Sequence, residues 1–210
     1  VNGFMVAFGR MIQYQSLSLV LSSGSLYFFS KKKYVWGSVF LALSVLSHWD
    51  AVFVLPITLF LFLYNRAGWK NYVLSVVIFC ALTLPFLVPY TQKYLADSEN
   101  QHYFSTRVGS KGLDIAGNFL EYKFKSELYN PFIFLPFILV FSVWAVLVRK
   151  SGEGPKKVFA VLGWFITTLV VFLFFVRKPG THVYNLFIPL SLLAGYGFWK
   201  FSDLLSKKAF

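Results

Sequence analysis

Acidic residues are scarce in this sequence, which has eight Asp and Glu against twenty Lys and Arg. Charged residues of both signs make up only 13% of the chain, about half the share of a typical soluble domain. Hydrophobic residues make up 57%, and the mean hydropathy is +0.63. So little charge excludes an ordinary soluble domain. We therefore expect an all-α fold, a polytopic transmembrane helical bundle that forms a single domain over residues 1–210.

Cysteine and histidine are also few. Cys80 is the only cysteine and lies inside an apolar run, so it has no disulfide partner in the chain and is expected to be a small core residue. The three histidines, at positions 48, 102 and 182, show no spacing typical of a metal site, alone or with the cysteine. We therefore expect no metal and no cofactor.

The net charge of +12 would suggest nucleic-acid binding in a soluble chain. Here the basic residues cluster in short segments between apolar runs, where they orient helices and contact anionic headgroups. We expect membrane lipids, and no nucleic acid, as partners. The chain also opens without Met or a basic segment before an apolar core, which indicates a fragment lacking its N-terminal part and not a signal peptide.

Seven apolar segments are expected to form helices, with residues 91–130 as a long external loop. The segments cover residues 12–29, 34–47, 51–64, 72–90, 131–148, 156–176 and 183–201. Within the loop, apolar residues recur at helical spacing from Leu113 to Leu128, which predicts one helix lying in the membrane interface. Pro131 then begins the next membrane helix.

The run from Tyr34 to Tyr64 is interrupted only by Ser47, His48, Trp49 and Asp50. As one helix it would be about 46 Å long, against a hydrocarbon core of about 30 Å. A lone carboxylate facing lipid at mid-bilayer would also cost about 2.5 to 3.5 kcal/mol. The run is therefore predicted to fold into two short helices, with His48 to Asp50 at the apex between them.

Basic residues support this hairpin, because it places twelve of them in short connections on one side and three on the other. The larger group is Lys31, Lys32, Lys33, Arg66, Lys70, Arg149, Lys150, Lys156, Lys157, Lys200, Lys207 and Lys208; the smaller is Arg10, Arg177 and Lys178. The rule that cytoplasmic loops carry excess Lys and Arg makes the larger group cytoplasmic. The apex, the long loop and residues 177–182 are then extracytoplasmic.

Three polar clusters fall on that outer side. Arg10, Gln13 and Tyr14 are three and four residues apart, so they share a helix face that could grip a phosphate or a sugar, or simply anchor the helix at the interface. His48 and Asp50 could relay a proton or orient a hydroxyl. The alternative there is a helix start capped by Ser47 or Asp50.

The third cluster runs from Arg177 and Lys178 through Pro179 and Gly180 to His182, with Tyr184 just inside the last helix. A cationic turn of this kind suits an anionic lipid phosphate. The alternative is a plain tight turn.

Four short strings at these positions, in order along most of the chain, resemble the membrane half of the family 39 glycosyltransferases, the dolichyl-phosphate-mannose protein mannosyltransferases and their relatives. The strings are Gly9-Arg10-Met11-Ile12-Gln13-Tyr14-Gln15, Ser47-His48-Trp49-Asp50-Ala51 followed by Pro56, Tyr129-Asn130-Pro131, and Pro179-Gly180-Thr181-His182-Val183-Tyr184-Asn185. The resemblance implies the GT-C fold, a polyprenyl-phosphate sugar donor and inverting transfer on the extracytoplasmic face. It also implies an acidic catalytic motif upstream of Val1.

The expected function is therefore transfer of a sugar, with mannose as one candidate, from a polyprenyl phosphate to an extracytoplasmic protein, lipid or glycan. Arg10, Arg177 and Lys178 would bind the donor phosphate, and His48 and Asp50 would support catalysis. The sugar and acceptor pocket would take Gln13, Tyr14, His182 and Tyr184. The expected location is a prokaryotic plasma membrane or the endoplasmic reticulum membrane. A transporter or lipid flippase is the alternative of a different class.

Overall fold

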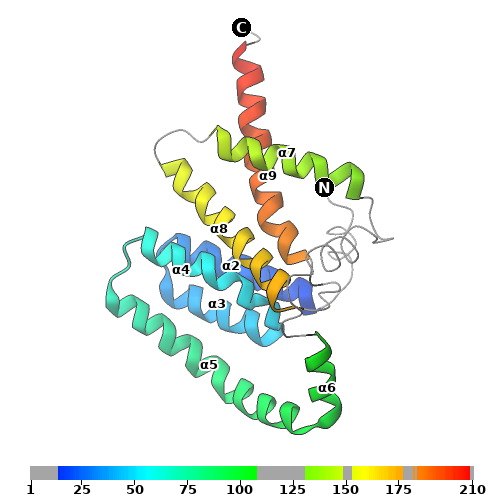
Figure 1. Cartoon of the computed structure of the whole chain (residues 1–210). Helices are drawn as coiled ribbons and strands as arrows, with labels where there is room; N and C mark the ends of the chain where they lie inside the picture. Colours follow the sequence, from blue (N-terminus) through cyan, green and yellow to red (C-terminus); the bar gives the residue numbers. More distant parts are fainter. Residues whose placement is uncertain (1–13, 108–130, 149–152, 177–181, 183, 209–210) are drawn as a thin grey trace. The chain divides into compact units, whose positions relative to one another are not determined.

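The computed structural model describes residues 14–107, 131–148, 153–176, 182 and 184–208 (Figure 1). In this part of the chain the fold is all-α, with eight α-helices and one 3-10 helix, η1. The elements are α2 (Tyr14–Ser30), α3 (Tyr34–Ser47), η1 (Trp49–Val54), α4 (Leu55–Tyr64), α5 (Trp69–Ala96), α6 (Ser98–Arg107), α7 (Pro131–Leu147), α8 (Glu153–Phe174) and α9 (Tyr184–Lys208). The prediction of an all-α chain is confirmed.

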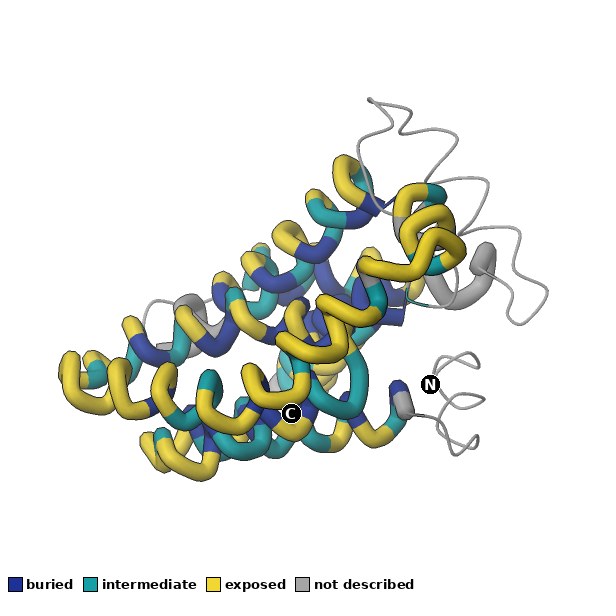
Figure 2. Tube along the Cα trace, turned by 90° about the horizontal axis from the view of Figure 1, so that it is seen from below, coloured by how far each residue is buried: buried dark blue, intermediate teal, exposed yellow. Residues whose placement is uncertain are grey.

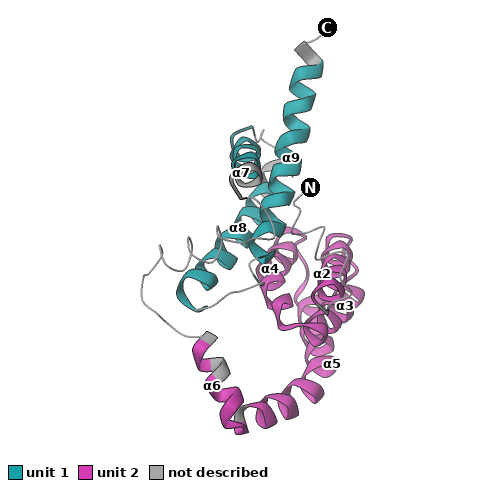
Figure 3. Cartoon of the chain, turned by 90° about the vertical axis from the view of Figure 1, so that its right-hand side faces the viewer, with its two compact units in different colours: residues 1–5, 110–210 teal, residues 6–109 magenta. Residues whose placement is uncertain are grey.

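The chain divides into two compact units, one of residues 6–109 and the other of residues 1–5 with 110–210 (Figure 3). The first unit contains α2 to α6, and the second contains α7 to α9. The predicted interfacial helix at 113–128 lies outside the described residues. The start of the expected external loop is helical, because α5 continues to Ala96 and α6 follows at once.

The run from 34 to 64 is broken where the sequence predicts. α3 ends at Ser47. In the last turn of α4, the Phe62 ring stacks on the ring of Tyr34, the first residue of α3, with 5.1 Å between the ring centroids. One continuous helix would hold these two rings about 42 Å apart, so the chain folds back on itself. The return helix starts later than expected, because η1 intervenes and Pro56, which has no N–H to donate, lies in the first turn of α4.

Serine side chains join α2 to α3. The Ser44 hydroxyl donates to the carbonyl of Ser18 (2.8 Å) and shares a hydrogen bond with the Ser22 hydroxyl (2.7 Å). Further along α2, the Ser25 hydroxyl donates to the Gly37 carbonyl at 2.9 Å. These pairs fix an antiparallel register, in which each step forward along α2 is a step back along α3. Small and hydroxylated residues that let two backbones approach are typical of helix pairs in membranes.

The helix α5 runs in the same direction as α3 (Figure 1). Near the start of α5, Tyr72 packs edge-on against Phe62, and further along, Phe79 packs against the buried cluster that contains Leu41 of α3. Residues 69–94 form the one described helix that is long and apolar enough to cross a membrane. Only 11% of its most apolar window is buried; exposed residues are yellow in Figure 2. Many of the exposed residues of α5 have large hydrophobic side chains, such as Leu74, Val77 and Phe86.

In the second unit, α9 packs on both α7 and α8. Ile138 of α7 forms a buried cluster with Leu190 and Ala194 of α9. The two backbones cross most closely at Gly197, where an added Cβ would overlap the carbonyl oxygen of Phe141. Glycine is required at this crossing because the space for a side chain is already filled by backbone.

Candidate functional site

His48 is the residue at which the hairpin turns. Its backbone is extended, with φ −164° and ψ 139°, and its N–H still donates to the Ser44 carbonyl at 3.0 Å. The same residue opens η1, where its Nδ1 atom accepts a hydrogen bond from the backbone N–H of Asp50 at 3.2 Å. One imidazole therefore ends α3 and caps the 3-10 helix that follows.

The Asp50 carboxylate lies against the same imidazole. Its Oδ2 atom is 3.4 Å from His48 Nδ1, and the Asp50 side chain is only 2% exposed. An imidazole nitrogen that accepts from an N–H has no proton, whereas one that pairs with a carboxylate must carry a proton. The Nδ1 atom of His48 thus has two mutually exclusive roles, which are to accept from the Asp50 N–H as a cap and to donate to the Asp50 carboxylate.

This pair can do chemistry that neither residue could do alone. A buried carboxylate is costly unless charged or hydrogen-bonding groups compensate it, and an adjacent imidazole can supply that compensation by taking a proton. Such a pair can accept a proton from a hydroxyl group and hold it, or orient the hydroxyl for attack on another molecule.

The alternative prediction, in which Ser47 or Asp50 caps the helix start at the apex, named the wrong residues. The Ser47 hydroxyl donates backward, to the Ser44 carbonyl at 2.7 Å, and Asp50 lies inside η1 and not at its start. The cap is the His48 side chain. Histidine is an uncommon cap, so the usual preference for Ser, Thr, Asp and Asn at helix starts pointed to the neighbouring residues.

The start of α2 lies at the same end of this unit. The α2–α3 register pairs Ser18 with Ser44 and Ser25 with Gly37, so the residues opposite the apex are Tyr14 and Gln15. Direct contacts between α2 and η1 agree with this placement. The start of α2, at Tyr14 and Gln15, and the His48–Asp50 pair, separated by more than thirty residues in sequence, therefore lie at one end of one unit.

Gln15 is a further candidate site residue that the sequence analysis did not select. Its side chain is 6% exposed, and its Oε1 atom has no hydrogen-bond partner among the described residues. Of the residues selected in this cluster, Arg10 and Gln13 lie outside the described part of the chain, and of Tyr14 only the backbone, at the start of α2, is described. The signal for Gln15 was present, since it falls in the same polar string as Gln13.

The third cluster belongs to the other unit. Tyr184 begins α9 and is 4% exposed, and the Asn185 amide donates to the His182 carbonyl at 3.0 Å. This bond closes the turn before the helix. Arg177 and Lys178, the expected phosphate ligands, lie outside the described residues. The phosphate-binding prediction for this turn stays a prediction.

Comparison of the chain with protein-family models, with curated proteins and with solved structures found no match.

Proposed function

We propose that the protein is a polytopic integral membrane glycosyltransferase that moves a sugar from a polyprenyl phosphate to an acceptor on the extracytoplasmic face. The observation that carries the proposal is the buried Asp50 carboxylate, 3.4 Å from the imidazole of His48 at a helix break. The resemblance of four short strings to the family 39 glycosyltransferases is the reason for proposing sugar transfer from a polyprenyl phosphate as the reaction. Gln15, the last residue of the first string, and Asp50, in the second, lie at one end of one unit.

Three features support the membrane placement. The surface of α5 is covered with large hydrophobic side chains, as a lipid-facing helix requires. α2 and α3 are joined through buried serine hydroxyls as well as through the Phe28 and Phe40 rings, and hydroxyls at such a contact are typical of helix pairs in membranes. The exposed cations in the two short turns of the first unit, from Lys31 to Lys33 and at Arg66, lie at the end opposite His48. We infer about seven membrane segments, with η1 and the start of α2 on the extracytoplasmic side.

In this proposal, the His48–Asp50 pair orients the acceptor hydroxyl and receives its proton as the sugar is transferred. Gln13, Tyr14 and Gln15 would hydrogen-bond the sugar or acceptor. Arg10, Arg177 and Lys178 would neutralise the phosphate as it becomes the leaving group. His182 and Tyr184 would complete the pocket.

The test is a transfer assay on the protein as its own gene encodes it, reconstituted in liposomes with a radiolabelled polyprenyl-phosphate sugar. Transfer of label to a water-soluble acceptor, lowered at least about tenfold by Asp50→Asn, would support the proposal. Label that never leaves the lipid with any acceptor tried would contradict it.

A transporter or flippase is the second candidate, and the broken hairpin at η1 is the observation that favours it, because discontinuous helices line many transport sites. The same liposomes separate the two. A flippase would move the labelled lipid between leaflets without cleaving the bond between sugar and phosphate. A transferase cleaves that bond.

A further inference from the structure

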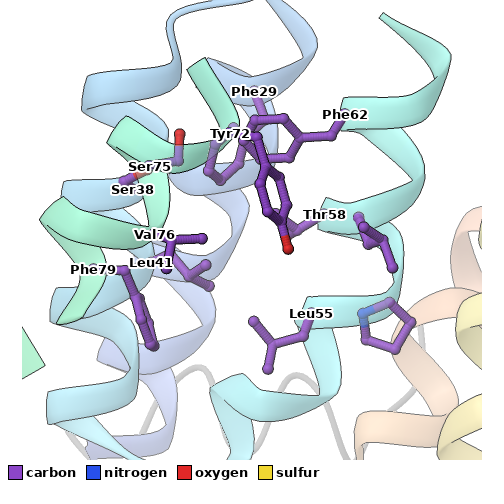
Figure 4. A pocket seen from close by; sticks show the side chains of 12 residues that line it. Phe29, Ser38, Leu41, Leu55, Thr58, Phe62, Tyr72, Ser75, Val76 and Phe79 are labelled. Carbon is purple, nitrogen blue, oxygen red and sulfur yellow. The ribbon is translucent and has the colours of Figure 1, made fainter. Parts of the chain in front are cut away.

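A cavity of about 460 Å³ lies between α3, α4 and α5, away from the His48–Asp50 pair. Its walls are almost entirely apolar, with Leu41, Val76 and Phe79 facing Leu55 across the opening (Figure 4). This volume is within the range of ligand-binding pockets. All of its lining residues belong to the first unit, so the cavity is complete within one compact body.

One buried polar group in the cavity lacks a partner. The Ser75 side chain is 5% exposed, and its hydroxyl has no hydrogen-bond partner among the described residues. The other two buried hydroxyls in the lining behave differently, since Ser38 donates to the Tyr34 carbonyl and Thr58 to the Val54 carbonyl, each one helical turn back. The fourth hydroxyl in the lining belongs to Tyr72, which is exposed. A buried hydroxyl that does not make this usual bond leaves a donor that a ligand atom can satisfy.

Basic residues lie near one end of the cavity. Phe29, Phe62 and Tyr72 line that end, and each is a few residues from a basic turn. The basic residues of these turns are Lys31, Lys32, Lys33, Arg66 and Lys70, all exposed. The Asn65 side chain ties the two turns together by donating to the Phe29 carbonyl at 2.9 Å. The sequence from 14 to 96 holds one acidic residue, Asp50, and it lies at the other end of α3.

We propose that this cavity binds an anionic phospholipid, with one acyl chain between α3, α4 and α5 and the phosphate on Arg66 and Lys70. Ser75 follows Lys70 by five residues, which places its hydroxyl about 7.5 Å deeper along the helix. The headgroup and interfacial layer on each side of a bilayer is about 5 to 7 Å thick. The Ser75 hydroxyl is therefore at the depth of the ester carbonyls, and it donates to one of them.

A lipid fits better than a protein helix. An α-helix is about 10 to 12 Å wide, so one turn alone would occupy roughly 500 Å³ and fill the cavity. A flexible acyl chain is narrow enough to enter between the three helices and follow the apolar walls. The inference rests on the membrane placement proposed above, but not on glycosyl transfer, because neither His48 nor Asp50 lines the cavity.

The test is native mass spectrometry of the full chain in lipid-free detergent, titrated with phosphatidylglycerol or with phosphatidylcholine of the same acyl chains. One phosphatidylglycerol should bind, at least about tenfold more tightly than phosphatidylcholine. Val76→Trp should weaken binding at least about tenfold, because the indole fills the cavity. Val77→Trp is the matched control, since Val77 is the adjacent valine of α5, is exposed and does not line the cavity.

Two further variants test the polar contacts. Ser75→Ala should weaken binding of both lipids several-fold, whereas the double variant Arg66→Gln, Lys70→Gln should remove only the preference for the anionic lipid. Lys93→Gln, an exposed lysine near the far end of α5, is the control. If Val76→Trp does not fold, Leu59→Trp replaces it, with the more exposed Leu63→Trp, which does not line the cavity, as its control.

Equal binding by the Val76→Trp and Val77→Trp proteins, or equal affinity for the two lipids, would overturn the inference. Carbonate extraction of membranes separates this failure from failure of the proposed function. A protein released by carbonate would overturn both. A protein that stays in the membrane and transfers sugar, yet binds neither lipid one to one, would overturn the lipid site alone.

Discussion

The side-chain amide of Asn65 donates to the backbone carbonyl of Phe29 at 2.9 Å. Asn65 follows α4 directly, and Phe29 lies in the last turn of α2, so one hydrogen bond joins two helix ends that are 36 positions apart in the sequence. The bond holds the two basic turns of the first unit together. It lies at the end of the hairpin opposite His48.

Asn65→Ala should therefore destabilise the first unit by about 1 kcal/mol, the usual worth of one such bond. The loss stays modest because the Phe29 carbonyl also accepts from the N–H of Lys32 at 3.0 Å. Unfolding in mixed detergent micelles, followed by circular dichroism, measures the change. Asn71→Ala, at an exposed position early in α5, is the matched control and should be neutral. Equal destabilisation by the two substitutions would mean that the Asn65 hydrogen bond does not contribute to the stability of this unit.

Gly197→Ala should destabilise the second unit by about 1 to 3 kcal/mol, the range for forcing an extra group into a packed interface. The new methyl group would overlap the Phe141 carbonyl and approach the backbone nitrogen of Ala145 to 3.2 Å, and backbone atoms cannot move aside as a side chain can. Gly195→Ala, on the same helix, meets nothing within 4 Å. That control should be neutral or slightly stabilising, because alanine favours helix over glycine by up to about 1 kcal/mol.

The same detergent unfolding experiment compares the two glycine variants, and their difference is the informative quantity. A Gly195→Ala protein as unstable as Gly197→Ala would mean that glycine is needed in α9 for a reason other than its crossing with α7.

The sidedness of the first unit can be tested by labelling. Single cysteines at Ser30 and Ser105, placed in a Cys80→Ser background, should react with an impermeant thiol reagent from opposite sides of sealed vesicles. Ser30 lies beside the basic turn, and Ser105 lies in α6, beyond the far end of α5, and both are exposed. Labelling of both from the same side would contradict the orientation that the basic residues predict.

Much of this arrangement follows from length and charge alone. A run of residues 34–64 is too long for one span and contains one carboxylate, and both facts require the break observed at His48. The start of α2 and the apex share one end of the unit because short connections make successive helices antiparallel. Apolar composition was enough to locate the helices, although their ends differ by several residues. Composition could not show where polar sequence continues a helix, as it does at the end of α5 and in α6.

The sequence alone did not predict which residues lie between paired helices or which side chain caps η1. The α2–α3 register depends on Ser18, Ser22 and Ser44, and nothing local marks which of the many serines face a partner helix. The cap at η1 depends on the extended backbone of His48, which directs Nδ1 toward the N–H of Asp50. The missing partner of Ser75 is visible only when the neighbouring helices are in place.

The last prediction separates the structural role of His48 from its chemical role. Asparagine accepts a hydrogen bond at a helix start and is a favoured cap, so His48→Asn should keep the bond from the Asp50 N–H and leave stability within about 0.5 kcal/mol of the wild-type protein. His48→Ala removes the acceptor and should cost about 1 kcal/mol. Neither variant can carry a proton as imidazole does. If the pair holds the acceptor's proton, both should lower transfer at least about tenfold, equivalent to about 1.4 kcal/mol of transition-state stabilisation.

Asp50→Asn and His48→Asn together form a double-mutant cycle. The asparagine amide at position 50 preserves the shape of the carboxylate while removing its charge. The two single variants should be similarly impaired and the double variant barely worse, since residues that act as one unit are not additive. Transfer rates in liposomes and unfolding in detergent are measured on the same preparations. If His48→Asn transfers sugar normally while His48→Ala does not, the imidazole serves only as a cap, and the proposed chemistry would then depend on Asp50 without its histidine partner.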